Sequence, residues 1–212
     1  MDTKQNYQIV LDRTLEEIGK SGTVPSLLLH VCCAPCASYV LEYLSAHFRI
    51  TAFYYNPNIT DAEEYDKRLS ELTRLAGSMP MDHPACVVSG RYEPGVFLAA
   101  SRGMEDLPEG GERCRACFRL RLEESARYAK AHGFDYFTTT LSISPLKDAQ
   151  LLNAIGREMQ EKYGVPYLYS DFKKRNGYRR SVELSQEYGL YRQDFCGCAF
   201  SKAERVRKTK EV

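Results

Sequence analysis

The sequence lacks any hydrophobic segment that could cross a bilayer, since nothing near ~18 consecutive apolar residues occurs in its 212 residues. Residues 1–22 are polar and amphipathic, without the basic start and apolar run of a secretory signal. The formal net charge is only +1, which gives no overall attraction to nucleic acid. These absences exclude a membrane-spanning class, and we expect a cytoplasmic protein with no membrane partner.

Internal repeats, low-complexity tracts and long linkers are also absent. Hydrophobic residues make up 43% and charged residues 27% of the chain, as in ordinary globular proteins. We therefore predict a single α/β domain over residues 26–202. A helical extension over 1–25 would precede this domain, and a basic tail over 203–212 would follow it.

Short, continuously apolar segments alternate with segments of helical periodicity along the chain. The apolar segments predict buried strands at 26–32, 49–55, 85–89, 135–141 and 165–172. The periodic segments predict helices at 6–19, 34–47, 60–77, 92–103, 114–133, 145–164 and 177–188. This alternation predicts an α/β fold, with a parallel sheet and helices on both of its faces. In such folds the active site lies at the carboxyl ends of the strands.

Two of the helix starts carry specific signals. Thr60 and Glu63 have the spacing of a capping box, which predicts that a helix begins at Thr60. Ser144 and Pro145 are typical of an N-cap and the first helical residue after it.

Eight cysteines are present, and seven of them fall into three tight groups. The groups are Cys32, Cys33 and Cys36; Cys114 and Cys117; and Cys196 and Cys198. In a reducing compartment, such grouping favours metal or redox chemistry over structural disulfides. Cys86 stands alone among apolar residues, and we expect it to be a buried core thiol that binds no metal.

Three kinds of thiol site could explain the groups. A disulfide or dithiol redox site is disfavoured, because adjacent Cys32 and Cys33 would form a strained ring and the other cysteines would stay unexplained. A structural zinc site uses four thiolates, and seven grouped cysteines are too many for one such site. An iron–sulfur cluster with additional thiol ligands fits better. Cys114 and Cys117 would lie on one face of a helix start, with Cβ atoms roughly 5–6 Å apart.

The adjacent pair suggests more than one metal centre. Neighbouring residues on an extended backbone point in opposite directions, so we expect Cys32 and Cys33 to serve two neighbouring centres. Cys196 and Cys198, separated by Gly197, could do the same. Seven thiols would then divide into four for a cluster and three for a second metal beside it.

Four segments of the chain carry a resemblance to a known family. They are LLLHVCCAPC (27–36), YYNPNI (54–59), residues 112–148 and residues 167–198, with Ser-Lys at 201–202 just after. In this order they resemble the QueH-type epoxyqueuosine reductases. The resemblance implies a nucleotide α-hydrolase fold of the PP-loop, HUP-like type, with CCAPC in place of the ATP-binding loop. It also implies reduction of epoxyqueuosine to queuosine at the wobble position of tRNA, with an external electron donor.

A 4Fe-4S cluster and an adjacent iron are the cofactors that this resemblance implies. The cluster ligands would be Cys33, Cys114, Cys117 and one of Cys196 and Cys198. The second iron would take Cys32, Cys36 and the other member of that last pair. Some relatives carry Asp at the position of Cys36, and the softer sulfur would change the metal preference of this chain.

Epoxide reduction also needs a proton donor, and three residues that flank the cysteine groups are candidates. They are His30, Tyr191 and Asp194. His30 could equally be a hydrogen-bonded residue inside the first strand. Asp194 could cap or orient the last cysteine loop.

Substrate contacts are expected in three segments. Residues 173–180 include five basic residues in eight, and they could neutralise tRNA phosphates while a tyrosine stacks on a base. A solvated surface is the ordinary alternative for such a run. Residues 56–59 and 138–144 follow predicted strands and would border the site. The predicted substrate-binding residues are Asn56, Asn58, Ser142, Ser144, Lys173, Lys174, Tyr178, Arg179 and Arg180.

Two alternative functions stay open. A PP-loop-like tRNA thiolation enzyme would bind ATP, but the sequence lacks the glycine-rich loop that cradles phosphates. An iron–sulfur sensor that binds nucleic acid would need a reading element, and no convincing helix-turn-helix pattern is present. The sequence therefore favours epoxyqueuosine reduction.

Overall fold

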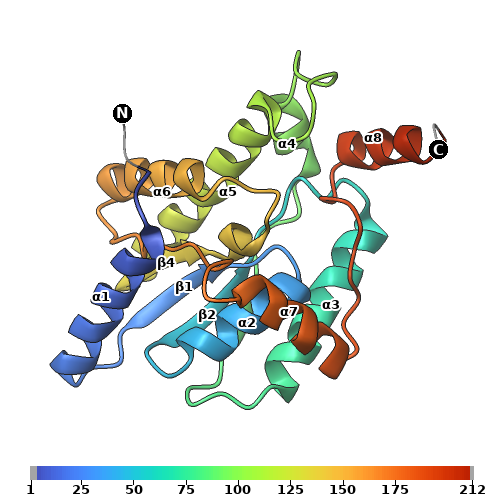
Figure 1. Cartoon of the computed structure of the whole chain (residues 1–212). Helices are drawn as coiled ribbons and strands as arrows, with labels where there is room; N and C mark the ends of the chain where they lie inside the picture. Colours follow the sequence, from blue (N-terminus) through green and yellow to red (C-terminus); the bar gives the residue numbers. More distant parts are fainter. Residues whose placement is uncertain (1–3, 211–212) are drawn as a thin grey trace.

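A computed structural model describes residues 4–210, apart from the side chains of residues 208–210. Within this part, four parallel strands form a sheet in the order β3-β2-β1-β4. The strands are β1 (Ser26–His30), β2 (Arg49–Tyr54), β3 (Cys86–Ser89) and β4 (Tyr136–Thr139). Because the strands run in the same direction, the segments that follow them meet at one edge of the sheet (Figure 1).

Helices cover both faces of the sheet, which confirms the predicted α/β class. One face packs against α1 (Tyr7–Ser21), α2 (Ala34–Leu44), α3 (Ala62–Ser78) and α7 (Gly177–Glu187). The other face packs against α5 (Glu112–Ala131) and α6 (Ala149–Tyr163). The remaining described helices are α4 (Pro94–Ala100), the 3-10 helix η1 (Thr140–Ile143) and α8 (Ala199–Lys210). Among the described helices, none is both long and apolar enough to cross a membrane.

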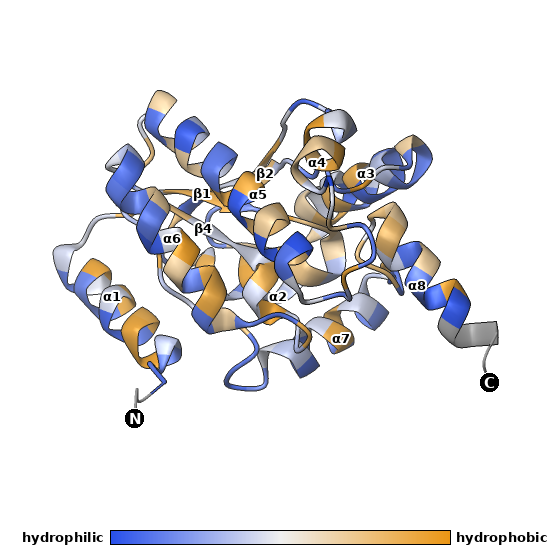
Figure 2. Cartoon of the chain, turned by 90° about the horizontal axis from the view of Figure 1, so that it is seen from above, coloured by the Kyte–Doolittle hydropathy of each residue, from blue (hydrophilic) through white to orange (hydrophobic). Residues whose placement is uncertain are grey.

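The central strand β1 shows how the sequence produces these layers. Leu27 and Leu29 pack into the core shared with α2 and α3, whereas Leu28 packs into the core shared with α5 and α6. Successive side chains of a strand point to opposite faces, so a strand covered on both sides needs a continuous apolar run. The covering helices carry hydrophobic and hydrophilic residues side by side (Figure 2), as expected of helices with one face on a core.

The predicted fifth strand at 165–172 is wrong. This segment makes an isolated parallel bridge between Phe137 and Tyr167 but no strand. The bridge consists of two backbone hydrogen bonds, from the N of Phe137 to the O of Pro166 at 3.0 Å and from the N of Leu168 to the O of Phe137 at 2.9 Å. The apolar residues of the segment are buried beside β4, but the pairing is limited to this one bridge and does not continue as a strand.

Both specific predictions of a helix start are too early. Helix α3 begins after Asp61, whose carboxylate accepts hydrogen bonds from two backbone N–H groups of the first turn, and not at Thr60. Helix α6 begins after Asp148, whose carboxylate accepts one hydrogen bond from the backbone N of Gln150. Ser144 and Pro145 therefore lie in the connection between η1 and α6.

Cys86 is exposed, so the prediction of a buried core thiol is wrong. It is the first residue of β3, which is an edge strand that pairs only with β2 in the described sheet. An edge strand of this kind leaves part of its side chains uncovered.

Helices lie near both ends of the described chain. Helix α1 lies within the predicted extension 1–25 and packs Leu11 and Leu15 into the core on one face of the sheet. Helix α8 begins before residue 203, so the predicted basic tail is the later part of a helix that projects from the rest of the chain (Figures 1 and 2). Residues 1–3 and 211–212 of these segments lie outside the described residues. The division into an extension, one domain and a tail stays a prediction.

Candidate metal centre

The first cysteine group lies at the carboxyl end of the central strand. Strand β1 ends at His30, Cys32 lies in a bend, and Cys33 is the extended N-cap residue of α2. A proline at the start of α2 has the fixed φ that suits a first helical turn. The strand and the helix start thus bring Cys32, Cys33 and Cys36 together at the edge of the sheet.

These three thiols, here called the thiol triad, face one another. Their Sγ atoms all lie within 4.8 Å of one another, and those of Cys32 and Cys33 are 3.8 Å apart. The prediction that these neighbours point in opposite directions is wrong, because the strand has ended and the chain bends at Cys32. Three sulfur atoms at this spacing could hold a metal ion.

Contacts inside the triad make its acidity unequal. Hydrogen bonds with Cys33 and Cys36 lower the pKa of Cys32 well below its ordinary value. The contact with Cys32 raises the pKa of Cys33 to about 12, and it raises the pKa of Cys36 well above its ordinary value. Cys32 therefore carries the first negative charge of the triad.

The other four grouped cysteines line a cavity of about 100 Å³, here called the smaller cavity. Cys114 and Cys117 belong to the first turns of α5, and Cys196 and Cys198 to the loop before α8. Burial raises the pKa of Cys117 to about 12 and that of Cys198 to about 11. A metal bound by these thiols would therefore have to displace their protons.

Gly197 permits the tight path of the last cysteine loop. Its φ is +109°, and a Cβ at this position would lie 2.9 Å from Cγ1 of Ile59. Both the backbone conformation and the close approach favour glycine here. The glycine that separates Cys196 from Cys198 thus has a geometric basis.

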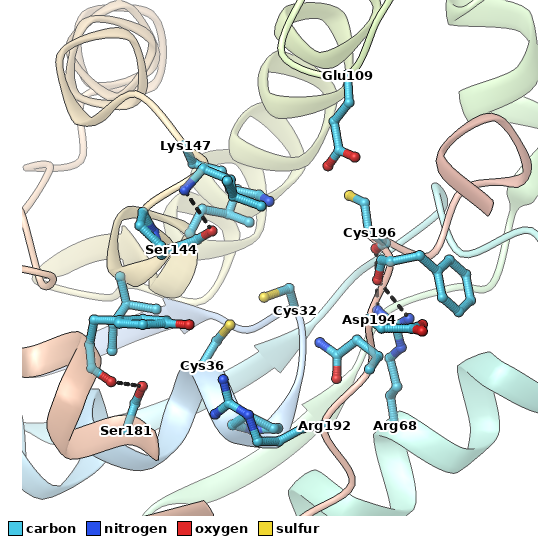
Figure 3. A pocket seen from close by; sticks show the side chains of 18 of the residues that line it. Cys32, Cys36, Arg68, Glu109, Ser144, Lys147, Ser181, Arg192, Asp194 and Cys196 are labelled. Carbon is cyan, nitrogen blue, oxygen red and sulfur yellow. Dashed lines mark hydrogen bonds between the residues drawn. The ribbon is translucent and has the colours of Figure 1, made fainter. Parts of the chain in front are cut away.

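A second cavity of about 210 Å³, here called the larger cavity, contains a different set of thiols. Cys32, Cys36 and Cys196 line it (Figure 3). Cys196 lines both cavities, so the three cysteine groups of the sequence meet at this edge of the sheet. Cys33 is only 1% exposed and is not among the lining residues described for either cavity.

Arg68 of α3 holds the last cysteine loop in place. Its guanidinium donates to the carbonyl oxygen of Cys196 at 3.2 Å and to that of Phe195 at 3.4 Å. Glu64 accepts from its Nε at 2.7 Å and balances its charge. Asn58 also donates to the Cys196 carbonyl at 3.5 Å, while its own Oδ1 is buried without a partner in the described part of the chain.

A second buried arginine joins α5 to the strand ends. Arg121 Nε donates to Nε2 of His30 at 3.3 Å, and Nη1 lies 4.0 Å from Sγ of Cys117. Burial and the charge of Arg121 lower the pKa of His30 to about 3. The other ring nitrogen of His30 lies 2.8 Å from Oγ1 of Thr139. This environment suits a neutral, hydrogen-bonded imidazole rather than the predicted proton donor.

The other two predicted proton donors are engaged away from the thiols. The hydroxyl of Tyr191 donates to the carboxylate of Glu64 at 3.2 Å. Asp194 lines the larger cavity, but its carboxylate pairs with Arg205 at 2.8 Å. Neither contact presents a proton to the space between the cysteines.

The predicted substrate-binding residues are only partly brought together. Ser144 and Tyr178 line the larger cavity, and Asn58 lines the smaller one. Asn56 and Ser142 are buried and serve the structure. Asn56 binds Arg121, and Ser142 accepts a hydrogen bond from the backbone N of Phe172.

Most charges of the basic segment 173–180 already have acidic partners. The pairs are Lys173 with Asp171, Arg179 with Glu183, Arg180 with Glu42, and Arg175 with Asp12. Lys174 is exposed. This segment therefore has a smaller free charge than its sequence suggests.

Sequence reasoning missed Arg68, Arg121 and Lys147. Lys147 lines both cavities, yet it stands in the connection before α6, where the helix was predicted to have begun. The two arginines lie on helices α3 and α5 at positions that resemble ordinary surface charges. For Lys147, its place in the segment that follows the predicted strand at 135–141 was the one available signal.

The fold and the site together define an α/β protein with thiols at the carboxyl edge of a parallel sheet that could hold a metal. Residues 27–204 match the family described as Epoxyqueuosine reductase QueH. The chain belongs to this family of oxidoreductases, which confirms the resemblance seen in the sequence.

Relatives with the same family name align with this chain over most of their length. The Epoxyqueuosine reductase QueH of Streptococcus pyogenes serotype M1 is 42% identical over 205 residues, which cover 93% of this chain and 78% of the relative. That of Staphylococcus epidermidis is 40% identical, covering 99% of this chain and 90% of the relative. That of Thermotoga maritima is 38% identical, covering 90% and 96%.

Proposed function

We propose that this protein reduces epoxyqueuosine to queuosine in tRNA. Membership of a family named for this reductase supports the proposal. The observation that carries it is the meeting of three cysteine groups at two adjoining cavities, at the edge where α/β proteins bind their substrates. We place the reaction in the cytoplasm.

The donor set fits a 4Fe-4S cluster and an adjacent iron. Thiolates are the ligands that iron–sulfur clusters use, and all of the described cysteines are free of disulfides. Seven grouped thiols allow four ligands for a cluster and three for a second iron. Asn58 lines the smaller cavity, and its buried Oδ1 has no hydrogen-bond partner among the described residues. This unpaired atom is consistent with a bound group in that cavity.

The two cavities support a division of the thiols, since Cys32 and Cys36 line only the larger cavity, Cys114, Cys117 and Cys198 line only the smaller one, and Cys196 lines both. We assign the second iron to Cys32, Cys36 and Cys196, because these three line the larger cavity. The cluster would then take the remaining four thiols, which are Cys33, Cys114, Cys117 and Cys198. This proposed division would give Cys196 to the second iron and Cys198 to the cluster, a choice that the sequence left open.

The overall reaction breaks both C–O bonds of the epoxide. The substrate gains two electrons and two protons, an alkene forms, and the oxygen leaves as water. When bound, the cluster and the iron would supply electrons one at a time and a Lewis acid for the epoxide oxygen. The electrons would come from an external one-electron donor.

The chain's own residues position the site and the tRNA. Arg68 and Asn58 fix the backbone at Cys196, and Arg121 places a permanent positive charge beside Cys117. Tyr178 and Leu146 are exposed where they line the larger cavity, and a base could stack there. Basic residues 173–180 would exchange weak surface ion pairs for tRNA phosphates.

Anaerobic reconstitution tests this proposal. The protein would be loaded with iron and sulfide, its iron counted, and a tRNA carrying epoxyqueuosine added with a chemical reductant. We expect about five irons per chain and conversion to queuosine, measured after digestion to nucleosides. Cys86→Ala removes an exposed thiol outside the groups and should match the parent protein. An unreduced tRNA would refute the reaction, and full activity with four irons would refute the second iron.

A further inference from the structure

Lys147 lies where the two cavities meet. It stands in the connection between η1 and α6 and lines both cavities, as Cys196 does. Figure 3 shows its side chain extending from this connection toward the space between Cys32 and Cys196. No other lysine is among the lining residues described for these cavities.

The ammonium of Lys147 is held in its charged form. Burial disfavours the charge, but attraction by Cys196, Cys32 and Cys36 outweighs burial and raises the pKa of Lys147 above its ordinary value. Within residues 4–207, its Nζ makes no hydrogen bond or ion pair. An ammonium carries three N–H donors, so these donors face the cavity and are available to a ligand.

The other charged groups of the larger cavity each make at least one hydrogen bond or ion pair of their own. Arg121 directs its N–H groups to His30, Asn56 and Cys117, and Arg68 directs its own to the last cysteine loop. Arg192 donates a single hydrogen bond, from Nη1 to the hydroxyl of Ser185 at 3.0 Å. The carboxylate of Glu109 accepts from Ser201, and ionised carboxylates cannot donate.

We propose that Lys147 donates a hydrogen bond from Nζ to the epoxide oxygen of the substrate. It thereby stabilises the negative charge that develops on this oxygen while the C–O bonds break. A donor fixed in advance beside a developing oxyanion, in a site sheltered from water, is among the strongest sources of transition-state stabilisation. The inference rests on the proposed function, since it names the oxygen that the reaction removes.

Binding distinguishes this role from a general attraction for tRNA. The product alkene lacks the epoxide oxygen, so only the substrate tRNA receives the Lys147 hydrogen bond. We expect the iron-loaded protein, without reductant, to bind epoxyqueuosine tRNA about tenfold more tightly than queuosine tRNA. Lys147→Met should weaken this preference and leave the affinity for queuosine tRNA nearly unchanged.

Turnover gives a second measurement. Lys147→Met should lower kcat about a hundredfold, as expected for loss of one oxyanion donor. Its iron content and visible absorption should match the parent protein, because Lys147 is not a thiol ligand. Lys147→Arg keeps the charge in a different geometry and should restore part of the binding preference. Lys130→Met, at the far end of α5 from Cys114, is the matched control and should behave as the parent does.

Several outcomes would overturn the inference. An equal loss of affinity for both tRNAs would make Lys147 a phosphate contact. If Lys147→Met kept the preference for epoxyqueuosine tRNA, Lys147 would have no role at the epoxide. If the variant lost iron, Lys147 would belong to the metal site. The proposed function fails separately, if the parent protein with full iron content reduces no epoxyqueuosine tRNA.

Discussion

Arg121 donates a 2.6 Å hydrogen bond from Nη2 to Oδ1 of Asn56, and both residues are fully enclosed. The amide of Asn56 donates in turn to the carbonyl oxygen of Val31 at 2.9 Å, one residue before Cys32. This chain of contacts connects α5, which carries Cys114 and Cys117, to the backbone that carries the thiol triad. In the described residues no carboxylate pairs with Arg121, so the thiolates are what balances its charge.

Replacing this arginine should change the redox behaviour of the site. Arg121→Met removes a positive charge beside Cys117, so adding an electron becomes less favourable and the midpoint potential should become more negative. It also leaves Asn56 and His30 without a donor, which should cost about 2–3 kcal/mol of stability. The potential is measured by a redox titration followed by electron paramagnetic resonance, and the stability by urea unfolding.

Two further variants separate charge from hydrogen bonding at this position. Arg121→Lys keeps the charge but not the fork of donors, so the potential should stay closer to that of the parent while stability falls. Arg127→Met changes an exposed arginine of the same helix, which pairs with Glu124, and should affect neither quantity. A parent-like potential in Arg121→Met would contradict the charge-balancing role.

The variants Cys196→Ala and Cys33→Ala should differ in how much iron each protein retains. If Cys196 binds the second iron, Cys196→Ala loses about one iron and keeps the visible absorption of the cluster. If Cys33 is a cluster ligand, Cys33→Ala loses most of its iron together with that absorption. Iron analysis and anaerobic absorption spectra measure both. If Cys33→Ala lost about one iron and Cys196→Ala lost the cluster absorption, Cys33 would bind the second iron and Cys196 the cluster.

Gly197→Ala should loosen the last cysteine loop. At a φ of +109°, an added Cβ is strained and lies 2.9 Å from Ile59, at a cost of about 1–3 kcal/mol. Because Cys196 and Cys198 flank this glycine, we expect a faster loss of iron to a chelator. Gly103→Ala has a positive φ of 77° with open space around it, so it tests backbone strain alone. An equal loss of iron in both variants would contradict a local effect at the loop.

Local patterns predicted much of the fold and the thiols, but not the residues that surround the thiols. The run of Leu27 to Leu29 predicts a central strand, because period-two alternation between two cores needs apolar residues throughout. The bend at Cys32 leaves no such signature, so the mutual approach of Cys32 and Cys33 was mispredicted. Arg121 and Lys147 meet the cysteines only through tertiary packing of α5 and the connection before α6. No periodic pattern in a single sequence predicts tertiary contacts of this kind.

Asp135 lies at the opposite end of the strands from the grouped cysteines. Its carboxylate should make the stability of the fold depend on pH in the acidic range. Its carboxylate accepts hydrogen bonds from Oγ of Ser26 at 2.7 Å and from the backbone N of Ser26 at 2.8 Å. These contacts tie the start of β1 to the turn before β4, and they hold the pKa of Asp135 below its ordinary value. The ionised form is thus favoured by folding, so its contribution is present above the pKa of the unfolded chain, about 3.9. This contribution is lost as the pH falls through the lower value of the folded state.

Asp135→Asn should therefore melt at a lower temperature than the parent at pH 7, and the difference should shrink below about pH 4. Thermal unfolding followed by circular dichroism at pH 7 and pH 3 measures this change. Loss of metal at acid pH affects both proteins, so the difference between them is the informative quantity. Asp82→Asn, at an exposed position in the loop before β3, controls for a general change of charge. A melting difference that stays constant between the two pH values would show that the ionised carboxylate of Asp135 does not hold β1 to β4.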